Sequence, residues 1–129
     1  MSFAEAEIIR RRAEAFLNNA EQLLKQSEWD LAVFSLEQYC QLIMKYKLLF
    51  KAGHYIRTPS LRRLVKELMK HHPGLETLIQ DEQNLHYLAR LEEACVTARY
   101  MPYVYEEKEA VSLYRFVREK FKPLVEEIK

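Results

Sequence analysis

The longest uninterrupted pattern of apolar positions in the chain runs from Trp29 to Phe50. No Gly or Pro breaks it, and apolar or small residues recur at the spacing of one helix face. A second apolar line follows the flanks of that face, so most of the circumference is apolar. Such a helix normally has neighbours on several sides, and the pattern predicts a central helix of about six turns. Charged and amide side chains interrupt it too often for a membrane span. The two lines consist of Ala32, Leu36, Tyr39, Cys40, Ile43, Tyr46 and Phe50, and of Leu31, Phe34, Leu42 and Leu49.

Helical periodicity also continues on both sides of this segment. It predicts one long helix over residues 3–26 and a shorter one over 58–72. Residues 75–99 are predicted to be helical in one or two pieces, and a last helix is expected over 106–128. Pro123 lies inside that last pattern and is expected to kink it or to mark its final turns.

Short polar residues and glycine mark the predicted helix ends. Ser2 and Ser27 are placed to cap the first and the central helix, and Thr58 to cap the third, with Pro59 in its first turn. Gly53 is placed to end the central helix in the left-handed conformation.

Composition supports one all-α domain over residues 1–129. The chain is 49% hydrophobic and holds 2 Gly and 4 Pro, which is typical of helices joined by short turns and is enough for one core. We therefore expect an up-and-down antiparallel bundle of four long helices plus one shorter helix. Cys40 and Cys95 are expected to be buried free thiols. Because no targeting or transmembrane segment is visible, a cytoplasmic protein with no membrane partner is expected.

Positive charge gathers in the middle of the chain. The formal net charge is only +1, but residues 45–72 hold eight Lys and Arg against a single Glu. This imbalance favours a phosphate-bearing or acidic partner. The alternative is a solvated surface that acidic faces elsewhere in the fold balance.

Familiar catalytic and metal-binding patterns are missing from the sequence. It has no Gly-rich phosphate loop, no zinc spacing, and no Glu three residues before a His, so no metal or cofactor is expected. What remains is the segment from Arg99 to Tyr103. An arginine there suits a phosphate, and Tyr100 and Tyr103 offer stacking faces for a base. Alternatively, Arg99 caps helix carbonyls and the tyrosines pack between helices.

Three segments, in order, resemble the HEPN family (higher eukaryotes and prokaryotes nucleotide-binding domain) in its small stand-alone prokaryotic form. They are 29–34 with the following residues 37–45, the loop and helix 57–64, and 98–103 before the last helix. The resemblance implies a helical bundle that commonly forms a homodimer. It also implies a minimal nucleotidyltransferase as partner, often in a toxin–antitoxin arrangement.

Many HEPN relatives are metal-independent ribonucleases built on Arg, four to six residues, then His. Arg99 fits the arginine, but the permitted histidine positions hold Val104, Tyr105 and Glu106, and all four histidines precede Arg99. None of these three side chains replaces an imidazole near neutral pH, so the nuclease activity does not carry over.

Three functions follow. The leading hypothesis is a non-catalytic module that binds nucleotide or RNA. The second is a metal-independent ribonuclease with an atypical site at Arg99, in which Tyr105 or another group replaces histidine. The third is a purely structural dimeric adaptor. The residues expected to bind nucleotide or RNA are Arg99, Tyr100, Tyr103, Arg57, Arg62 and Arg63.

Overall fold

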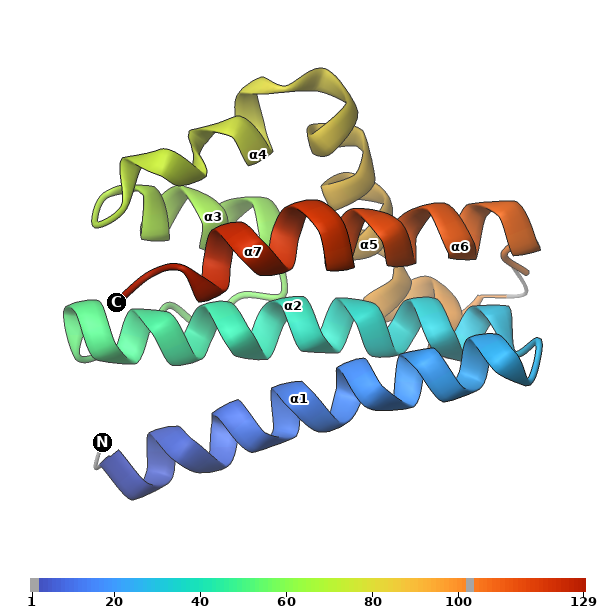
Figure 1. The fold of residues 1–129 in the computed structure, drawn as a ribbon, viewed down its shortest axis with the longest axis horizontal. Helices are drawn as coiled ribbons and strands as arrows, with labels where there is room; N and C mark the ends of the chain where they lie inside the picture. The colour runs from blue at the N-terminus through green and yellow to red at the C-terminus, as the bar shows by residue number, and fades with distance from the viewer. Residues whose placement is uncertain (1–2, 102–103) are drawn as a thin grey trace.

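The computed structural model describes residues 3–101 and 104–129, and all regular secondary structure in these two ranges is helical (Figure 1). The all-α prediction is therefore confirmed. The elements in chain order are α1 (Phe3–Lys25), α2 (Trp29–Ala52), α3 (Leu61–Met69), the 3-10 turn η1 (Pro73–Glu76), α4 (Thr77–Gln80), α5 (Glu82–Tyr100), α6 (Glu107–Phe116), the π-helical turn η2 (Val117–Phe121) and α7 (Lys122–Glu126).

Helix α2 lies in the middle of the molecule, as its sequence predicts. It contacts α1, α3, α5, α6 and α7, and it contributes more buried residues than any other helix among those described (Figure 1). Its buried face carries large side chains such as Leu36, Tyr39 and Met44, which are fully enclosed. Burial of apolar area on this scale is the main force that holds such a bundle together.

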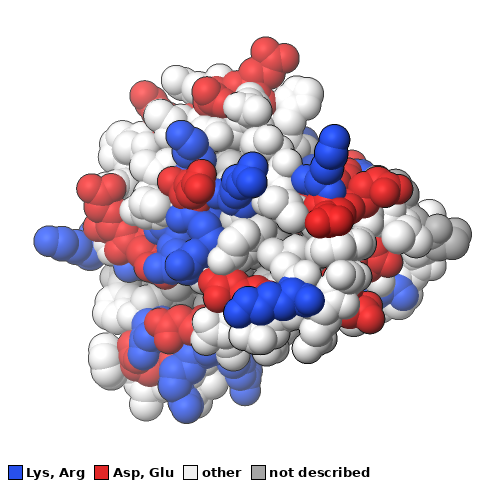
Figure 2. Space-filling model, turned by 45° about the vertical axis from the view of Figure 1, so that its right-hand side comes forward, with Lys and Arg blue, Asp and Glu red and all other residues white. Residues whose placement is uncertain are grey.

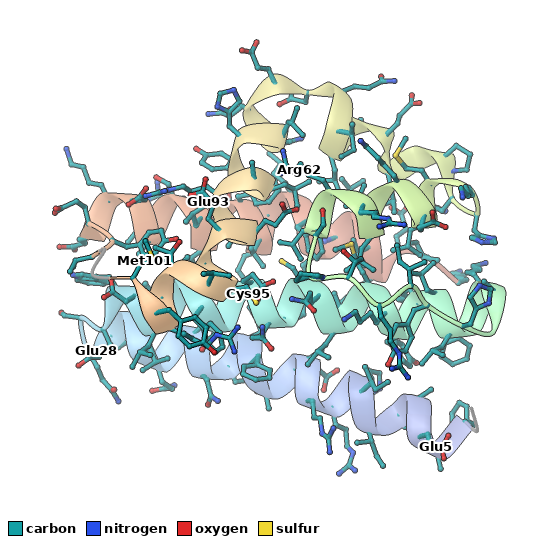
Figure 3. The ribbon with its side chains drawn as sticks, turned by 180° about the vertical axis from the view of Figure 1, so that it is seen from behind. Glu5, Glu28, Arg62, Glu93, Cys95 and Met101 are labelled. Carbon is teal, nitrogen blue, oxygen red and sulfur yellow. The ribbon has the colours of Figure 1, made fainter. Side chains whose placement is uncertain are left out.

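The predicted up-and-down order holds for only part of the bundle. Helix α1 runs antiparallel to α2, but α6 and α7 run in the same direction as α2 (Figure 1). The Tyr105 amide, just before α6, bonds to Asp30 at the start of α2, and Lys47 near the end of α2 bonds to the Ile128 carbonyl. Helix α5 crosses α2 steeply (Figures 1 and 3). Short turns enforce antiparallel neighbours, whereas the whole of α3 to α5 intervenes between α2 and α6.

The cap predictions are right for Gly53 and wrong for Ser27. Gly53 ends α2 with φ 78°, and its N–H bonds to the Leu49 carbonyl. Ser27 does not cap α2; it has φ 61° and closes α1, because the N–H of Glu28 reaches back to the Leu23 carbonyl at 2.9 Å. Glu28 is the residue before α2 and makes no side-chain cap. Ser2 lies outside the described residues.

The start predicted for the third helix is also wrong. Helix α3 begins at Leu61, and Ser60, not Thr58, is its N-cap: the Ser60 hydroxyl accepts from the Arg63 amide at 3.3 Å. The Thr58 hydroxyl instead accepts from the Ser60 amide at 3.1 Å, which makes a local turn before the helix. Thr58 and Ser60 are two residues apart, and either hydroxyl can cap a helix. The sequence alone does not show which of the two is the N-cap.

The region around Pro123 is accommodated without a break. Proline has no N–H to give to the preceding turn, and the hydrogen-bond pattern changes one turn earlier to the π form of η2, where the Lys122 N–H bonds to the Val117 carbonyl. Helix α7 then continues to Glu126. The predicted irregularity at Pro123 is thus a widened turn before the proline.

Tyrosine hydroxyls join the long helices to one another. Tyr46 of α2 donates to Glu7 of α1 at 3.2 Å, and Tyr114 of α6 donates to Glu21 of α1 at 2.9 Å.

In the part of the chain that the structure describes, no helix combines the length and apolar character that crossing a bilayer requires.

Candidate functional site

A stripe of polar side chains runs along α2 where α5 crosses it. Glu37 is fully buried, and its two carboxylate oxygens accept from the side-chain amides of Gln38 at 2.7 Å and Gln41 at 2.6 Å. Lys45, one turn further on, donates to the Gln41 amide oxygen at 3.0 Å. A helix places residues four apart on one face, so these groups form a hydrogen-bonded chain.

Arg99 approaches this stripe from the last turn of α5. Its guanidinium carbon lies 5.7 Å from the Phe34 ring centroid, one turn before Glu37 on α2, and 4.9 Å from that of Tyr100. The side chain bends back onto its own helix: Nε donates to the Cys95 carbonyl at 2.7 Å, and Nη2 lies 3.6 Å from the Cys95 sulfur. Figure 3 shows Cys95 where α5 passes in front of α2. We call Glu37, Gln38, Gln41, Lys45 and Arg99 the α2–α5 cluster.

Glu37 is the group in this cluster that titrates near neutral pH. Burial raises the pKa of its carboxyl to about 7, against the hydrogen bonds from Gln41 and Gln38 and the nearby charges of Lys45 and Arg99, which lower it. The same surroundings act on the neighbours: burial lowers the pKa of Lys45 and raises that of Cys95. A group whose pKa is strongly perturbed by burial and by specific charged neighbours is typical of functional sites.

The structure places the sequence-predicted site residues at two locations. Arg99 belongs to the α2–α5 cluster, and Tyr100 lies next to it; Tyr100 is 71% exposed, so it does not pack between helices. Arg57 and Arg63 are exposed on the loop before α3 and on α3 itself. Tyr103 lies outside the described residues.

Arg62 already has a partner. Its Nη2 lies 2.8 Å from the Glu92 carboxylate of α5, which also accepts from the Ser60 hydroxyl and the Arg62 amide. Other cations of the basic segment are engaged as well: Lys70 pairs with Glu67, and Lys47 donates to the Ile128 carbonyl. On the face that Figure 2 shows, basic and acidic side chains are interspersed. Arg62, Lys70 and Lys47 are thus already engaged within the protein, which leaves less of the positive charge of residues 45–72 for a partner.

The residues that sequence reasoning missed are Glu37, Gln41 and Lys45. In the sequence they interrupt the apolar pattern and fall within the family-like segment 37–45, and Lys45 is counted in the basic segment, but none of them is predicted to be a site residue. Their spacing of four residues, within a helix whose pattern is apolar over most of its circumference, was the available signal, since buried polar residues are the informative exceptions in a core.

No imidazole contacts Arg99 in the structure, and all four histidines lie in its described ranges. At the positions where ribonucleases of the family carry histidine, Tyr105 is fully buried, with the Arg90 guanidinium 4.9 Å from its ring centroid. Tyr105 is therefore not the surface group that the atypical-nuclease hypothesis requires.

Cys40 and Cys95 are both free; Cys40 is buried as predicted, and Cys95 is only partly buried.

Fold and site together define a small helical domain with a polar, arginine-flanked cluster on its central helix. The family model for the HEPN domain matches residues 6–128. The chain therefore belongs to the HEPN family, a class of helical nucleotide-binding or ribonuclease-type modules. A comparison with curated proteins finds no match.

Proposed function

We propose that the chain is a binding module that holds a nucleotide or RNA by its phosphate at the α2–α5 cluster, without cleaving it. One observation carries the proposal: Lys45 and Arg99 both act electrostatically on a fully buried carboxyl, Glu37, at the crossing of α2 and α5. A buried ionisable group costs stability, and two cations beside it are the arrangement that an anionic ligand would complete.

The side chains offer complementary contacts to such a ligand. Arg99 is exposed, and the part of its guanidinium not bonded to Cys95 is available as a planar donor for phosphate. Lys45 adds a second cation; it lies 5.5 Å from the Tyr55 ring centroid. Tyr100 presents an exposed ring on which a base can stack.

A binding experiment tests this proposal. A short single-stranded RNA and ATP are titrated into the wild type, Arg99→Gln and Lys45→Gln at low salt, where electrostatic binding is strongest. We expect each variant to lower the affinity about tenfold, the magnitude of one lost charge-assisted contact. Arg12→Gln, which removes an exposed arginine of α1, is the matched control. Equal affinity of Arg99→Gln and wild type would contradict the site, and no binding at all would favour the structural adaptor.

We also propose that the module is a homodimer and that its protein partner is a minimal nucleotidyltransferase of toxin–antitoxin type. Exposed apolar side chains beside the cluster support a contact surface: Val96 and Tyr100 are one turn apart on α5, and Val104 follows closely. Leu31 is next to Asp30, which binds the Tyr105 amide, so it adjoins the same surface. A monomer in light scattering would contradict the homodimer. Co-expression that recovers no complex with a minimal nucleotidyltransferase would contradict the proposed partner.

A specific observation favours metal-independent RNA cleavage as the second candidate. Glu37, with a pKa of about 7, is able to accept and return a proton near neutral pH, which is the task of the missing histidine. Its full burial is the reason that binding is the first proposal. RNA incubated with the protein in a chelator should then be cut by the wild type and left intact by Glu37→Gln and by Arg99→Gln. Intact RNA after long incubation with the wild type would exclude this activity.

A further inference from the structure

A hollow in the surface lies between the first half of α5 and the junction of α6 with η2. Its volume is about 200 Å³, and its lining includes Tyr87, Ser112, Arg115, Phe116 and Lys120. Along α5, Tyr87 is separated from Arg99 by 12 residues, which is about 18 Å at 1.5 Å per residue. The hollow is thus separate from the α2–α5 cluster.

Two cations line this hollow. Arg115 and Lys120 are exposed and make no ion pair or hydrogen bond in the part of the chain that the structure describes. Their neighbours in sequence differ: Arg118 lies 3.7 Å from Glu21, and Lys122 lies 2.6 Å from Glu126. Glu119 also lines the hollow, so its charged groups sum to one positive charge, which favours an anionic occupant.

An aromatic wall lies beside these cations. The Tyr87 ring packs on Phe116, with centroids 5.2 Å apart and planes 33° apart, and Phe116 is almost completely buried. Tyr87 is therefore held in place while remaining partly exposed. It also lines an adjoining, wider hollow with Glu82 and His86, so a planar group stacked on it has room to extend. A fixed ring of this kind is a good surface for stacking another ring.

From this combination we propose that the hollow binds a small organic anion that carries both a planar ring and a carboxylate or phosphate. The Arg115 guanidinium holds the acidic group in its planar fork, and Lys120 and the Ser112 hydroxyl add donors. The ring of the ligand lies against Tyr87. An aromatic carboxylate and a nucleoside monophosphate share this chemistry, and the smaller of the two fits a volume of about 200 Å³ better.

Calorimetric titration distinguishes these ligands and tests the site. The probes are 4-hydroxybenzoate and adenosine 5′-monophosphate; phenol and acetate are the half-ligands of the first, and adenosine and inorganic phosphate are those of the second. We expect at least one complete probe to bind one-to-one, at least tenfold more tightly than either half-ligand, because ring and acid act together. The complete probe that binds more tightly identifies the source of the anion. Binding no tighter than that of the half-ligands would overturn the proposal.

Variants assign the binding to this hollow. Arg115→Gln should weaken it about tenfold, and Tyr87→Leu should remove the preference for a ring. Arg118→Gln, three residues further along in η2 and close to Glu21, is the control that should change nothing. If Arg99→Gln removes the binding and Arg115→Gln does not, the probe occupies the α2–α5 cluster, which overturns this proposal while leaving the proposed function intact. Since Arg115 is exposed, its substitution tests the site even if Tyr87→Leu disturbs the packing on Phe116.

Discussion

Gln41 donates a 2.6 Å hydrogen bond from its side-chain nitrogen to Oε2 of Glu37, one turn earlier on α2, and both residues are buried. A carboxyl inside a bundle of apolar side chains is costly unless it is hydrogen-bonded or neutral. Gln41 and Gln38 supply the bonds, and the raised pKa near 7 lets the group become neutral below that pH. The central helix thus carries a group that works against stability at the place where the ligand is proposed to bind.

This arrangement predicts how stability depends on pH. The pKa of Glu37 is raised from 4.5 to about 7, so the folded state binds the proton more tightly than the unfolded state. Its contribution to the free energy of unfolding is therefore most favourable below pH 4.5 and is lost as pH rises through 7. Glu37→Gln, which stays neutral, should be more stable than wild type at pH 8 by on the order of 2–3 kcal/mol.

Urea unfolding at pH 5 and pH 8 measures this difference. The advantage of Glu37→Gln should shrink strongly at pH 5, because the wild-type carboxyl is then mostly protonated in the folded state. Glu76→Gln, at an exposed position of η1, is the control and should show no such pH dependence. An equal difference between Glu37→Gln and wild type at both pH values would contradict the prediction.

The sequence predicts the helices well because burial and periodicity are local signals. The α2 pattern from Trp29 needs no knowledge of the partners, since most of the circumference of that helix is buried. The direction of α6 relative to α2 is a different matter. It depends on how α3 to α5 return the chain, and no local residue records that path.

The candidate site is less predictable for a related reason. Arg99 is recognisable from its place before Pro102, but its relation to Glu37 depends on the angle at which α5 crosses α2. Arg62 illustrates the opposite error: it looks available in the sequence, yet Glu92 of a distant helix engages it at 2.8 Å. Charge counts along a chain leave out partners that only the fold brings close.

The contact between Glu92 and the start of α3 predicts a second effect on stability. Burial acts to raise the pKa of Glu92, but the hydrogen bonds from the Arg62 side chain, the Arg62 amide and Ser60 together outweigh it and lower the pKa. Glu92→Gln removes the negative charge, so the hydrogen bonds from the Arg62 side chain, the Arg62 amide and the Ser60 hydroxyl at the start of α3 become weaker. We expect a loss of about 1–2 kcal/mol at pH 7.

The sign of the shift fixes the pH window for Glu92. A lowered pKa means that the stabilisation is present above 4.5 and is lost as pH falls through the folded-state value, so the difference between Glu92→Gln and wild type should shrink in acid. Glu93→Gln is the matched control, because its exposed pair with Arg90 at 2.8 Å should contribute little. Thermal unfolding at pH 7 and pH 4 tests both variants. A loss for Glu93→Gln as large as that for Glu92→Gln would show that the α3 contact is not the cause.

Two helix ends make a matched pair for a third prediction. Ser27 and Gly53 both have positive φ, 61° and 78°, but only one of them is glycine. Ser27→Gly should raise the free energy of unfolding by about 0.5 kcal/mol. A residue with a side chain is strained by roughly 1 kcal/mol in the left-handed region, and glycine relieves that strain. Part of the relief is offset because glycine gives the unfolded chain more conformational entropy. Gly53→Ala should lower it by about 1 kcal/mol.

Chemical denaturation of the variants distinguishes backbone strain from lost contacts. A Cβ added at Gly53 meets nothing within 4 Å, so crowding does not explain a loss there. Ser27→Ala keeps the strain and removes the hydroxyl, and it should therefore match the wild type. If Ser27→Ala stabilises as much as Ser27→Gly, the hydroxyl and not the backbone is responsible.

The last prediction couples ligand binding to the protonation of Glu37. The groups that act on this carboxyl are Gln38, Gln41 and Lys45 from α2 and Arg99 from α5. An anion held by Arg99 and Lys45 brings negative charge close to Glu37 and offsets the two cations that lower its pKa. Binding should therefore raise that pKa further and take up a fraction of a proton near pH 7.

Calorimetry in two buffers with different ionisation enthalpies measures this proton uptake directly. For the RNA or nucleotide that binds the α2–α5 cluster, we expect affinity to rise about two- to fivefold from pH 8 to pH 6, a range set by a pKa change of roughly half to one unit. Glu37→Gln should bind the same ligand with little dependence on pH, and with an affinity at pH 8 close to that of the wild type at pH 6. If the wild type binds with the same affinity at pH 6 and pH 8 while Arg99→Gln still weakens binding, the ligand site would stand and its coupling to Glu37 would be contradicted. The arginine would then hold the phosphate, and the buried carboxyl beneath it would serve only the fold.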